Sequence, residues 1–324
     1  MNPCVIGIDI GGTNTVLGLV ERSGNCVAEA TLPTRGAEPV GQFLPRLYEH
    51  VEILLQRATD EGLTLQGIGI GAPNANFYTG TIEHPPNLAW EGVTPLAEFV
   101  RERFGVPVAL TNDANAAALG EMFFGAAQGM KNFVVVTLGT GLGSGIVVDG
   151  NVLYGSDGFA GELGHVTVVQ GGRQCGCGRR GCLETYASAT GIRRTVAELI
   201  ADRMDAETNA SPLRDIPFSA LTAAHIAETA KLGDALALEA FERTGDILGR
   251  ALANTIAYLS PEAIILFGGL ANAGELLLQP TRRAMQAHTL NIFRGKTLLL
   301  VSTLMERNAA VLGASALIWK ELAA

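Results

Sequence analysis

The sequence contains one dense group of side chains that can bind a metal. Cys175, Cys177 and Cys182 lie close together, and His165 precedes them at the end of the segment Gly161–His165. Three thiolates and one imidazole form the tetrahedral Cys₃His set that Zn²⁺ favours, and the intervening glycines let the chain fold around one ion. Four protein ligands leave no open position, so the pattern predicts a structural zinc site. Unlinked thiols are the alternative interpretation.

Two carboxylates, Glu162 and Glu184, flank the cysteine cluster. Carboxylate oxygens accept several hydrogen bonds from hydroxyl groups, which suits a polyol ligand such as a sugar. If zinc fixes the loop, both carboxylates and His165 can face one sugar molecule. The competing interpretation is that the two glutamates are ordinary solvated surface charges.

Three glycine-containing turns each follow an apolar run. Where glycine leaves no Cβ in the way, backbone N–H groups can approach and bind a phosphate. The turns comprise Gly11, Gly12 and Thr13, then Gly139, Thr140 and Gly141, and finally Gly268 and Gly269. A single turn of this kind is ordinary, whereas three in one chain indicate phosphate binding. Asp9, at the end of the run before the first turn, is placed to hold Mg²⁺ directly or through water.

Asp113 lies where a predicted strand meets a predicted helix, in the segment Thr111–Ala117. A carboxylate in that position can act as a general base, removing a proton from a sugar hydroxyl while the hydroxyl attacks the γ-phosphate of ATP. The local alternative is that Asn112 or Asp113 only caps the helix and interacts with its dipole.

The elements that must position these residues alternate between strands and helices. Apolar runs predict strands at Val5–Ile10, Val16–Val20, Gly67–Gly71, Val106–Leu110, Phe133–Leu138, Gly145–Val148, Ala263–Phe267 and Leu298–Ser302. Helical periodicity predicts helices at Phe43–Ala58, Leu96–Phe104, Ala114–Phe124, Ser188–Met204, Ala223–Tyr258 and Ala309–Lys320. Two strand–glycine turn–strand units suggest duplicated domains. The alternation predicts an α/β architecture with helices covering a mostly parallel sheet.

Composition narrows the possible classes of protein. The chain has 324 residues, enough for two domains, and its formal net charge of −9 argues against nucleic-acid binding, which needs clustered Lys and Arg. Its richest apolar runs are about half of the ~20 residues that a membrane-spanning helix needs. The start of the chain lacks the charged and apolar regions of a signal peptide. We therefore expect a cytoplasmic protein with no membrane or nucleic-acid partner.

Taken together, these motifs resemble the ROK family (repressor, open reading frame, kinase). The matching segments are Asp9–Thr13, Asn112–Ala116, Leu138–Gly141, Gly161–His165, Cys175–Glu184 and Gly268–Gly269, which span nearly the whole chain. The resemblance implies an actin-like or hexokinase-like ATPase fold of the α/β class, with two domains around a nucleotide and sugar cleft. The small domain would comprise residues 1–115 and the C-terminal helix 305–324. The larger domain, residues 116–304, would carry the zinc loop.

The same resemblance implies an ATP-dependent hexose kinase, most similar to glucokinases, that phosphorylates the 6-hydroxyl of glucose with Asp113 as the base. It implies hexose contacts from Asn87, Asn112, Asp113, Glu162, His165 and Glu184. His165 would then bind zinc with one ring nitrogen and a sugar hydroxyl with the other. Members of the family commonly form homodimers or homotetramers, so a homo-oligomer is expected.

Other functions remain open on the sequence. The segment Gly71–Asn76 departs from the Gly-Pro-Gly-like turn of many family members, so allose, fructose, mannose or an N-acetyl-amino sugar is an alternative substrate. A catalytically inactive sugar sensor would be expected to lack the base or the glycine turns, and both are present. A sugar-responsive repressor requires an added N-terminal helix-turn-helix domain, whereas here the first phosphate hairpin begins at Val5 and the net charge is negative.

Overall fold

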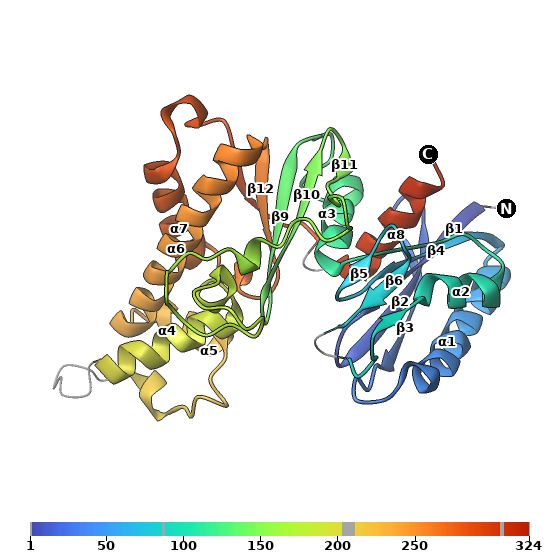
Figure 1. Cartoon of the computed structure of the whole chain (residues 1–324), viewed down its shortest axis with the longest axis horizontal. Coiled ribbons are helices and arrows are strands. Elements are labelled where there is room, and N and C mark those ends of the chain that lie inside the picture. Colours follow the sequence, from blue (N-terminus) through green and yellow to red (C-terminus); the bar gives the residue numbers. More distant parts are fainter. Residues whose placement is uncertain (1, 86–87, 203–210, 305–307, 324) are drawn as a thin grey trace. The chain divides into compact units, whose positions relative to one another are not determined.

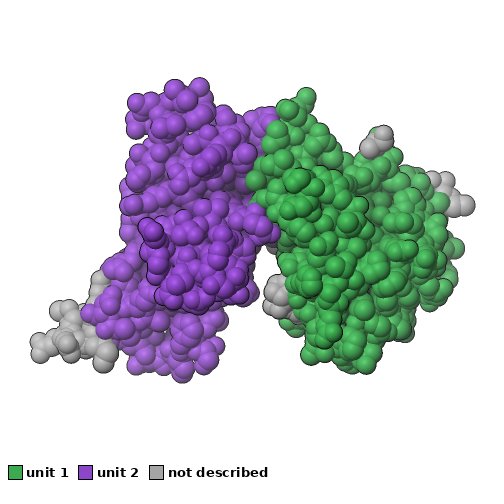
Figure 2. Space-filling view, in the orientation of Figure 1, with its two compact units in different colours: residues 1–131, 145–161, 302–324 green, residues 132–144, 162–301 purple. Residues whose placement is uncertain are grey.

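Strands and helices alternate along the chain, as the sequence predicts. The computed structural model describes residues 2–85, 88–202, 211–304 and 308–323. It divides into two compact units, which Figure 2 shows in different colours. Unit 1 comprises residues 1–131, 145–161 and 302–324, and unit 2 comprises residues 132–144 and 162–301.

Unit 1 contains a five-stranded sheet with the order β3-β2-β1-β4-β8 (Figure 1). Its strands are β1 (Asn2–Ile10), β2 (Asn14–Glu21), β3 (Cys26–Pro33), β4 (Leu63–Gly71) and β8 (Val108–Thr111). β1 and β2 form the predicted antiparallel hairpin, while β4 runs parallel to β1 and β8 runs parallel to β4. A small second sheet joins β5 (Ala75–Asn76), β6 (Thr81–Glu83) and β7 (Val93–Thr94).

Helices cover both faces of this sheet. They are α1 (Val40–Asp60), α2 (Leu96–Phe104), α3 (Asp113–Phe124) and α8 (Ala309–Glu321). Because neighbouring residues of a strand point to opposite faces, the isoleucines of β1 and β4 share a core with α1, whereas the alternating glycines face α8. Burial of this apolar surface on both faces stabilises the sheet that places the strand ends.

Glycine permits the close approach of α8 to the sheet. A Cβ on Gly69 would lie 1.8 Å from the carbonyl oxygen of Ala314, and one on Gly7 would lie 2.3 Å from that of Val311. Both positions lie in the middle of strands, where glycine ordinarily weakens the strand. Here it lets the backbone of the helix pack directly against the backbone of the sheet.

The second five-stranded sheet has the order β11-β10-β9-β12-β13. Its strands are β9 (Phe133–Leu138), β10 (Leu142–Val148), β11 (Asn151–Val152), β12 (Ala263–Phe267) and β13 (Leu298–Val301). In both sheets the third, second, first, fourth and fifth strands follow one another in space, so the duplicated strand–turn–strand pattern of the sequence reflects a repeated topology. The chain passes from unit 2 to unit 1 within β10.

Unit 2 contains the helices α4 (Ala189–Asp202), α5 (Ala223–Lys231), α6 (Ala235–Leu259) and α7 (Glu275–His288). The helical region expected at Ala223–Tyr258 is interrupted, because Gly233 adopts a φ of 88° and Asp234 begins a new helix by accepting a hydrogen bond from the backbone of Ala237. Short 3₁₀ turns lie at Leu163–His165, Leu183–Thr185, Pro212–Asp215, Ala271–Ala273 and Asn291–Phe293. Among the described residues, every helix is too short or too polar to cross a membrane.

The two compact units do not follow the boundary expected at residues 115/116. That boundary would cut α3, whereas unit 1 keeps the helix whole and also contains residues 145–161. The physical reason is close packing of α3 on α8, where a Cβ on Gly313 would lie 2.4 Å from the carbonyl oxygen of Ala116. The division into functional domains remains a prediction.

Candidate functional site

Strand register brings two predicted acidic residues together in unit 1. Asp9 pairs with Gly71 at the end of β4, and Gly71 pairs with Thr111 at the end of β8, which leads directly into Asp113. A Cβ on Gly71 would lie 3.8 Å from Oδ1 of Asp9 and 3.9 Å from Cα of Asp113. The absence of a side chain at Gly71 therefore leaves space between the two carboxylate-bearing residues.

Asn112 performs the helix-capping role that the sequence left open. Its Oδ1 accepts hydrogen bonds from the backbone N–H groups of Ala114 (2.7 Å) and Asn115 (3.4 Å). Asp113 also accepts from Ala114 through Oδ1, at 2.8 Å, but its side chain remains exposed to solvent. With the N-terminus of α3 already capped by its neighbour, the Asp113 carboxylate is available for chemistry.

The environment of this acidic pair favours protonation. Burial, together with the neighbouring Asp113 charge, raises the pKa of Asp9 to about 7. Desolvation by the surrounding protein atoms raises the pKa of Asp113 above its ordinary range. Hydrogen bonds from the backbone N–H groups of Ala114 and Asp113 act in the opposite direction and lower it. Two carboxylates in mutual repulsion form a site that a cation or a proton stabilises.

The first glycine turn follows β1 in the same unit. The N–H of Gly11 donates to the carbonyl oxygen of Asn14 at 3.0 Å, and the carbonyl of Thr13 accepts from Thr34 at 2.8 Å. Gly12 lies between these two contacts, partly exposed. Asn87, expected to contact the hexose, lies outside the described residues.

The other two glycine turns lie next to one another in unit 2. β9 and β12 are parallel neighbours that end at the same edge, with Thr137 paired to Phe267. After β12, Gly268 adopts a φ of 103°, and a Cβ there would lie 2.9 Å from the carbonyl oxygen of Leu138. The turn Gly139, Thr140 and Gly141 follows Leu138 directly. The N–H of Gly139 closes it by donating to the carbonyl oxygen of Gly141 at 3.1 Å.

The four predicted metal ligands converge in unit 2. One ligand atom from each of His165, Cys175, Cys177 and Cys182 lies within 4.8 Å of the others. Sγ of Cys177 lies 3.7 Å from Sγ of Cys182, and Sγ of Cys175 lies 3.7 Å from Nδ1 of His165. Tetrahedral zinc, with Zn–S bonds of ~2.3 Å, places its sulfur ligands ~3.8 Å apart. The donor set and its spacing therefore fit zinc.

The thiols of the cluster differ in acidity. Burial and the nearby Glu184 carboxylate raise the pKa of Cys175. At Cys177 burial also opposes ionisation, but hydrogen bonds from the main chain and side chain of Arg179, together with those from the neighbouring thiols, lower the pKa to about 6. A thiolate is the form that binds metal, and the surroundings of Cys177 favour that form.

The two predicted sugar-binding glutamates lie on opposite sides of the His165 ring. Oε1 of Glu184 lies 3.8 Å from Nδ1, the nitrogen nearest the cysteines, and Oε2 of Glu162 lies 3.9 Å from Nε2. Glu184 also accepts a 2.9 Å hydrogen bond from Sγ of Cys175. His165 can thus present one nitrogen to the metal ligands and the other toward Glu162.

Glu184 lies close to the second glycine turn as well. A Cβ on Gly141 would lie 2.7 Å from its Oε2. The N–H of Ala189, at the start of α4, donates to the carbonyl of Gly139 at 2.9 Å. Unit 2 therefore brings a predicted phosphate turn, a predicted sugar carboxylate and the metal ligands into one continuous set of contacts.

Sequence reasoning missed one prominent residue beside this cluster. Arg173 is 9% exposed and pairs with Glu198 on α4 at 2.6 Å. Its position two residues before Cys175 gives no motif that distinguishes it from the exposed Arg179 and Arg180 of the same loop. Only its burial in the folded chain identifies it.

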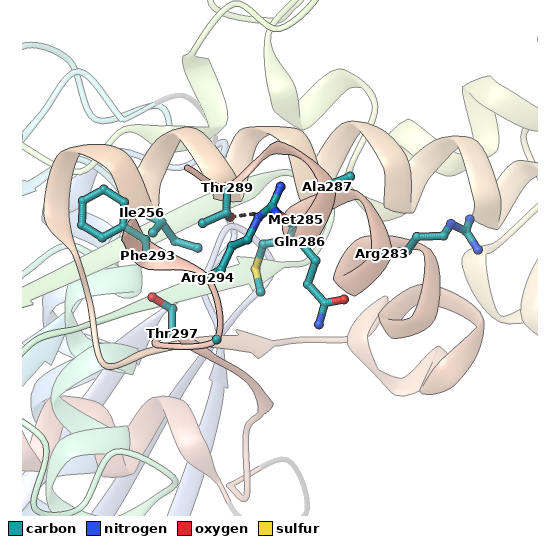
Figure 3. Close-up of a pocket in the computed structure, with 10 residues that line it drawn as sticks. Ile256, Arg283, Met285, Gln286, Ala287, Thr289, Phe293, Arg294 and Thr297 are labelled. Atoms are coloured by element: carbon teal, nitrogen blue, oxygen red, sulfur yellow. Dashed lines mark hydrogen bonds between the residues drawn. The ribbon is translucent and has the colours of Figure 1, made fainter. Parts of the chain in front are cut away.

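Unit 2 also contains a cavity of about 490 Å³ (Figure 3). Its lining comes from α6, α7 and the segment that follows α7: Ile256, Arg283, Met285, Gln286, Ala287, Thr289, Phe293, Arg294, Gly295 and Thr297. None of these is a predicted site residue. We assign the cavity no part in the site.

Known proteins are similar to this chain over nearly its whole length. Residues 5–321 match the model of the ROK family. The chain is 38% identical to the glucokinase of Halalkalibacterium halodurans over 287 residues, covering 88% of this chain and 86% of the relative. It is 37% identical to the glucokinase of Thermotoga maritima, covering 97% of this chain and 96% of the relative.

Solved structures that are similar to this chain also come from the ROK family. A ROK family glucokinase from Streptomyces griseus, in complex with glucose and AMPPNP, has a TM-score of 0.79 and 32% identity, covering 96% of this chain and 98% of that chain. A ROK family transcriptional regulator, a homologue of the E. coli MLC protein, has a TM-score of 0.88 and 28% identity, covering 99% of this chain and 79% of that chain. These structures confirm the predicted hexokinase-like α/β fold. By this match in sequence and in fold, the chain belongs to the ROK family.

Proposed function

We propose that this protein is an ATP-dependent glucokinase that transfers the γ-phosphate of ATP to the 6-hydroxyl of glucose, with Asp113 as the general base. Family membership and similarity to glucokinases over nearly the whole chain make it a sugar kinase. The observation that carries the finer proposal is the position of Asp113. It is a solvent-accessible carboxylate at the N-terminus of α3, beside Asp9 and the first glycine turn.

In the proposed reaction, the carboxylate of Asp113 accepts the proton of the 6-hydroxyl while that oxygen forms a bond to the γ-phosphorus. The bond from the γ-phosphorus to the bridging oxygen breaks, and ADP leaves with the electron pair. A positioned base typically contributes ~10²–10⁴ in rate, and the rest of phosphoryl transfer depends on positioning and charge stabilisation. Because protonated Asp113 cannot act as a base, its raised pKa predicts that activity falls as the solution becomes more acidic.

The other residues have supporting roles in this proposal. Asn87, Asn112, Glu162, His165 and Glu184 bind the hexose together with Asp113, and the glycine turns bind the phosphates of ATP. Asp9 supports Mg²⁺, which would neutralise phosphate charge when bound. The proximity of Asp9 and Asp113, with the raised pKa of Asp9, supports a cation at this place.

Zinc would be structural in this enzyme. His165, Cys175, Cys177 and Cys182 would fill its coordination shell, so the ion would leave no position open for a phosphate or a sugar. The ion would restrain the loop that carries Glu162 and Glu184. Those carboxylates, and not the metal, would contact the hexose.

A coupled ADP assay with a panel of hexoses tests the proposal. We expect MgATP turnover with glucose to exceed turnover with allose, fructose, mannose or N-acetyl-amino sugars, and ³¹P NMR of the product to show phosphate on the 6-oxygen. Asp113→Asn is the matched control for contaminating kinases. Turnover of wild type no higher than that of Asp113→Asn would refute the proposal.

A sugar-responsive regulator is the second candidate, because the regulator noted above has the higher TM-score of the two structures, 0.88 against 0.79. Such a protein would bind a hexose without releasing ADP. Calorimetric hexose binding, measured beside the ADP assay, separates the two functions. We further propose a cytoplasmic homodimer or homotetramer, and light scattering of the purified protein gives its mass in solution.

A further inference from the structure

Arg173 uses every hydrogen-bond donor of its guanidinium group. Nε and Nη2 donate to the two carboxylate oxygens of Glu198, at 2.8 and 2.6 Å. Nη1 donates to the carbonyl oxygens of Thr185 (2.6 Å) and Gly191 (3.0 Å), and Nη2 also donates to Oγ1 of Thr195 at 2.9 Å. Five N–H donors meet five acceptors, which is the full capacity of an arginine side chain.

The main chain of Arg173 makes two further contacts in the same region. Its N–H donates to the hydroxyl of Tyr186 at 2.9 Å, and its carbonyl accepts from the N–H of Gly181 at 2.8 Å. The guanidinium carbon also lies 4.4 Å from the centre of the Tyr186 ring. Arg173 therefore links the start of the cysteine loop, the segment that carries Cys175, Cys177 and Cys182, to its end.

These contacts join three segments of unit 2. The first is the start of the cysteine loop, to which Arg173 itself belongs. The second runs from Gly181 to Tyr186 and carries Cys182 and Glu184, and the third is α4. The zinc ligands are other residues, so the contacts of Arg173 use none of the metal-ligating side chains.

The contacts of Arg173 are specific to arginine. A buried charge without partners is strongly unfavourable, and here each donor has an acceptor, including one carboxylate bound by two parallel bonds. A lysine keeps the charge but has only three donors on one nitrogen, so it cannot reach acceptors spread over Thr185, Gly191 and Glu198. Replacement by lysine would break most of these bonds, including the one to the carbonyl oxygen of the buried residue Thr185.

We propose that Arg173 is a positioning residue that holds the Glu184 segment and both ends of the cysteine loop against α4, through contacts that use none of the metal-ligating side chains. Its effect on the hexose KM rests on the proposed function, in which Glu184 binds the hexose. Because the N-terminus of α4 also contacts the second glycine turn, Arg173 connects the sugar carboxylate to the element next to that turn.

Hydrogen exchange on the full chain tests the positioning role without using activity. The variants are Arg173→Lys and Arg173→Met, with Arg180→Met as the control, because Arg180 is an exposed arginine of the same loop. Wild type treated with a chelator should keep the amides of Gly181 and Thr185–Ala187 protected. The Arg173 variants should lose this protection even with zinc bound, while Arg180→Met should match wild type.

Metal affinity gives a second readout. Partners that orient metal ligands typically change metal affinity ~10–100-fold when removed, and a competition assay with a chromogenic chelator should show a loss in this range for both Arg173 variants. Glu198→Gln, which keeps the shape of the partner but removes its charge, should show a smaller loss in the same direction. This variant also keeps the test decisive if Arg173→Met fails to fold.

Steady-state kinetics then tests whether the contacts of Arg173 affect hexose binding. The hexose KM of Arg173→Lys should rise ~10-fold or more, whereas the ATP KM and kcat should change much less. Two results would overturn the proposal: amides of Gly181 and Thr185–Ala187 that exchange rapidly in chelated wild type, or an Arg173→Lys variant with wild-type exchange and metal affinity. If wild type phosphorylates no hexose, the proposed function fails, while the exchange and metal data still decide the role of Arg173.

Discussion

The two units place their predicted functional residues by different physical means. In unit 1, Asp9 and Asp113 lie side by side because parallel strands end in register at Gly71 and Thr111. In unit 2, Glu162 and Glu184 belong to a segment whose only helices are two short 3₁₀ turns and whose only ladder contacts are isolated bridges at Thr167–Cys182 and Gln174–Arg180. That segment depends for its shape on the hydrogen bonds of its turns and on side-chain contacts.

The two units differ in which interactions must be lost before a site carboxylate can change position. In unit 1 the backbone of Asp9 belongs to β1 and that of Asp113 begins α3, so we expect their placement to be as stable as the unit itself. In our proposal the unit 2 carboxylates depend on a few metal ligands and on the contacts of Arg173, so we expect that one substitution can release them while the fold persists. Unit 1 variants should therefore affect either chemistry or global stability, and unit 2 variants should affect local order and sugar affinity.

The largest expected effect comes from Asp113→Asn. The variant keeps the shape of the side chain and the bond to Ala114 but removes the base, so kcat should fall by at least ~10² while hexose binding persists. Stopped-flow or coupled ADP kinetics, with calorimetric glucose binding beside them, measures both quantities. Turnover close to wild type would reduce Asp113 to an auxiliary cap of α3.

Removal of one metal ligand should produce the next largest effect. Cys177→Ser should lower zinc content and raise the hexose KM ~10–100-fold, with a much smaller change in the ATP KM. Cys26→Ser is the matched control, because this cysteine lies on β3 in unit 1 and donates to the carbonyl of Ala28, as a serine can. A zinc-free Cys177→Ser protein with a normal hexose KM would show that Glu162 and Glu184 do not depend on the metal.

A glycine substitution in the unit 1 sheet should lower global stability and leave sugar affinity of the folded fraction unchanged. Gly69→Ala places a methyl group against the backbone of α8, and overpacking of this kind costs ~1–3 kcal/mol or more in free energy of unfolding. Gly41→Ala in α1 is the control, since a Cβ there meets no atom within 4 Å. Urea unfolding followed by circular dichroism compares the pair, and equal stabilities would contradict the packing argument.

The most gradual effect, spread over several pH units, is a pH dependence of stability that belongs to unit 1. Folding raises the pKa of Asp9 from 3.8 to about 7, so between these values the folded state binds more protons than the unfolded state. The contribution of Asp9 to the free energy of unfolding is therefore complete below pH ~4. It is lost as the pH rises toward 7, by at most ~1.4 kcal/mol per pH unit. Unfolding of wild type and Asp9→Asn in metal-free buffer should differ in this slope. Parallel slopes would show that Asp9 titrates normally.

The sequence predicts those parts of the molecule whose structure is set by residues close together in the chain. The hairpin tips, the strand before Asp113 and the Cys₃His set all appear where expected, because glycine, apolar runs and ligand spacing act over short distances. The interruption at Gly233 and the course of residues 145–161 were not predicted, because tertiary packing decides them. The nearness of Asp9 to Asp113 follows from pairing across distant strands, and the role of Arg173 follows from burial, which its neighbours in sequence do not indicate.

The packing of α8 on β1 and β4 has a consequence for how the protein is made. These strands leave the ribosome early, but the helix that covers their glycine face follows β1 by roughly 300 residues, or ~15–60 s at usual rates of synthesis. During that interval one face of the N-terminal sheet has no permanent cover. Nascent chains halted before α8 should therefore bind chaperones and be cut by proteases in unit 1, and release of α8 should end both.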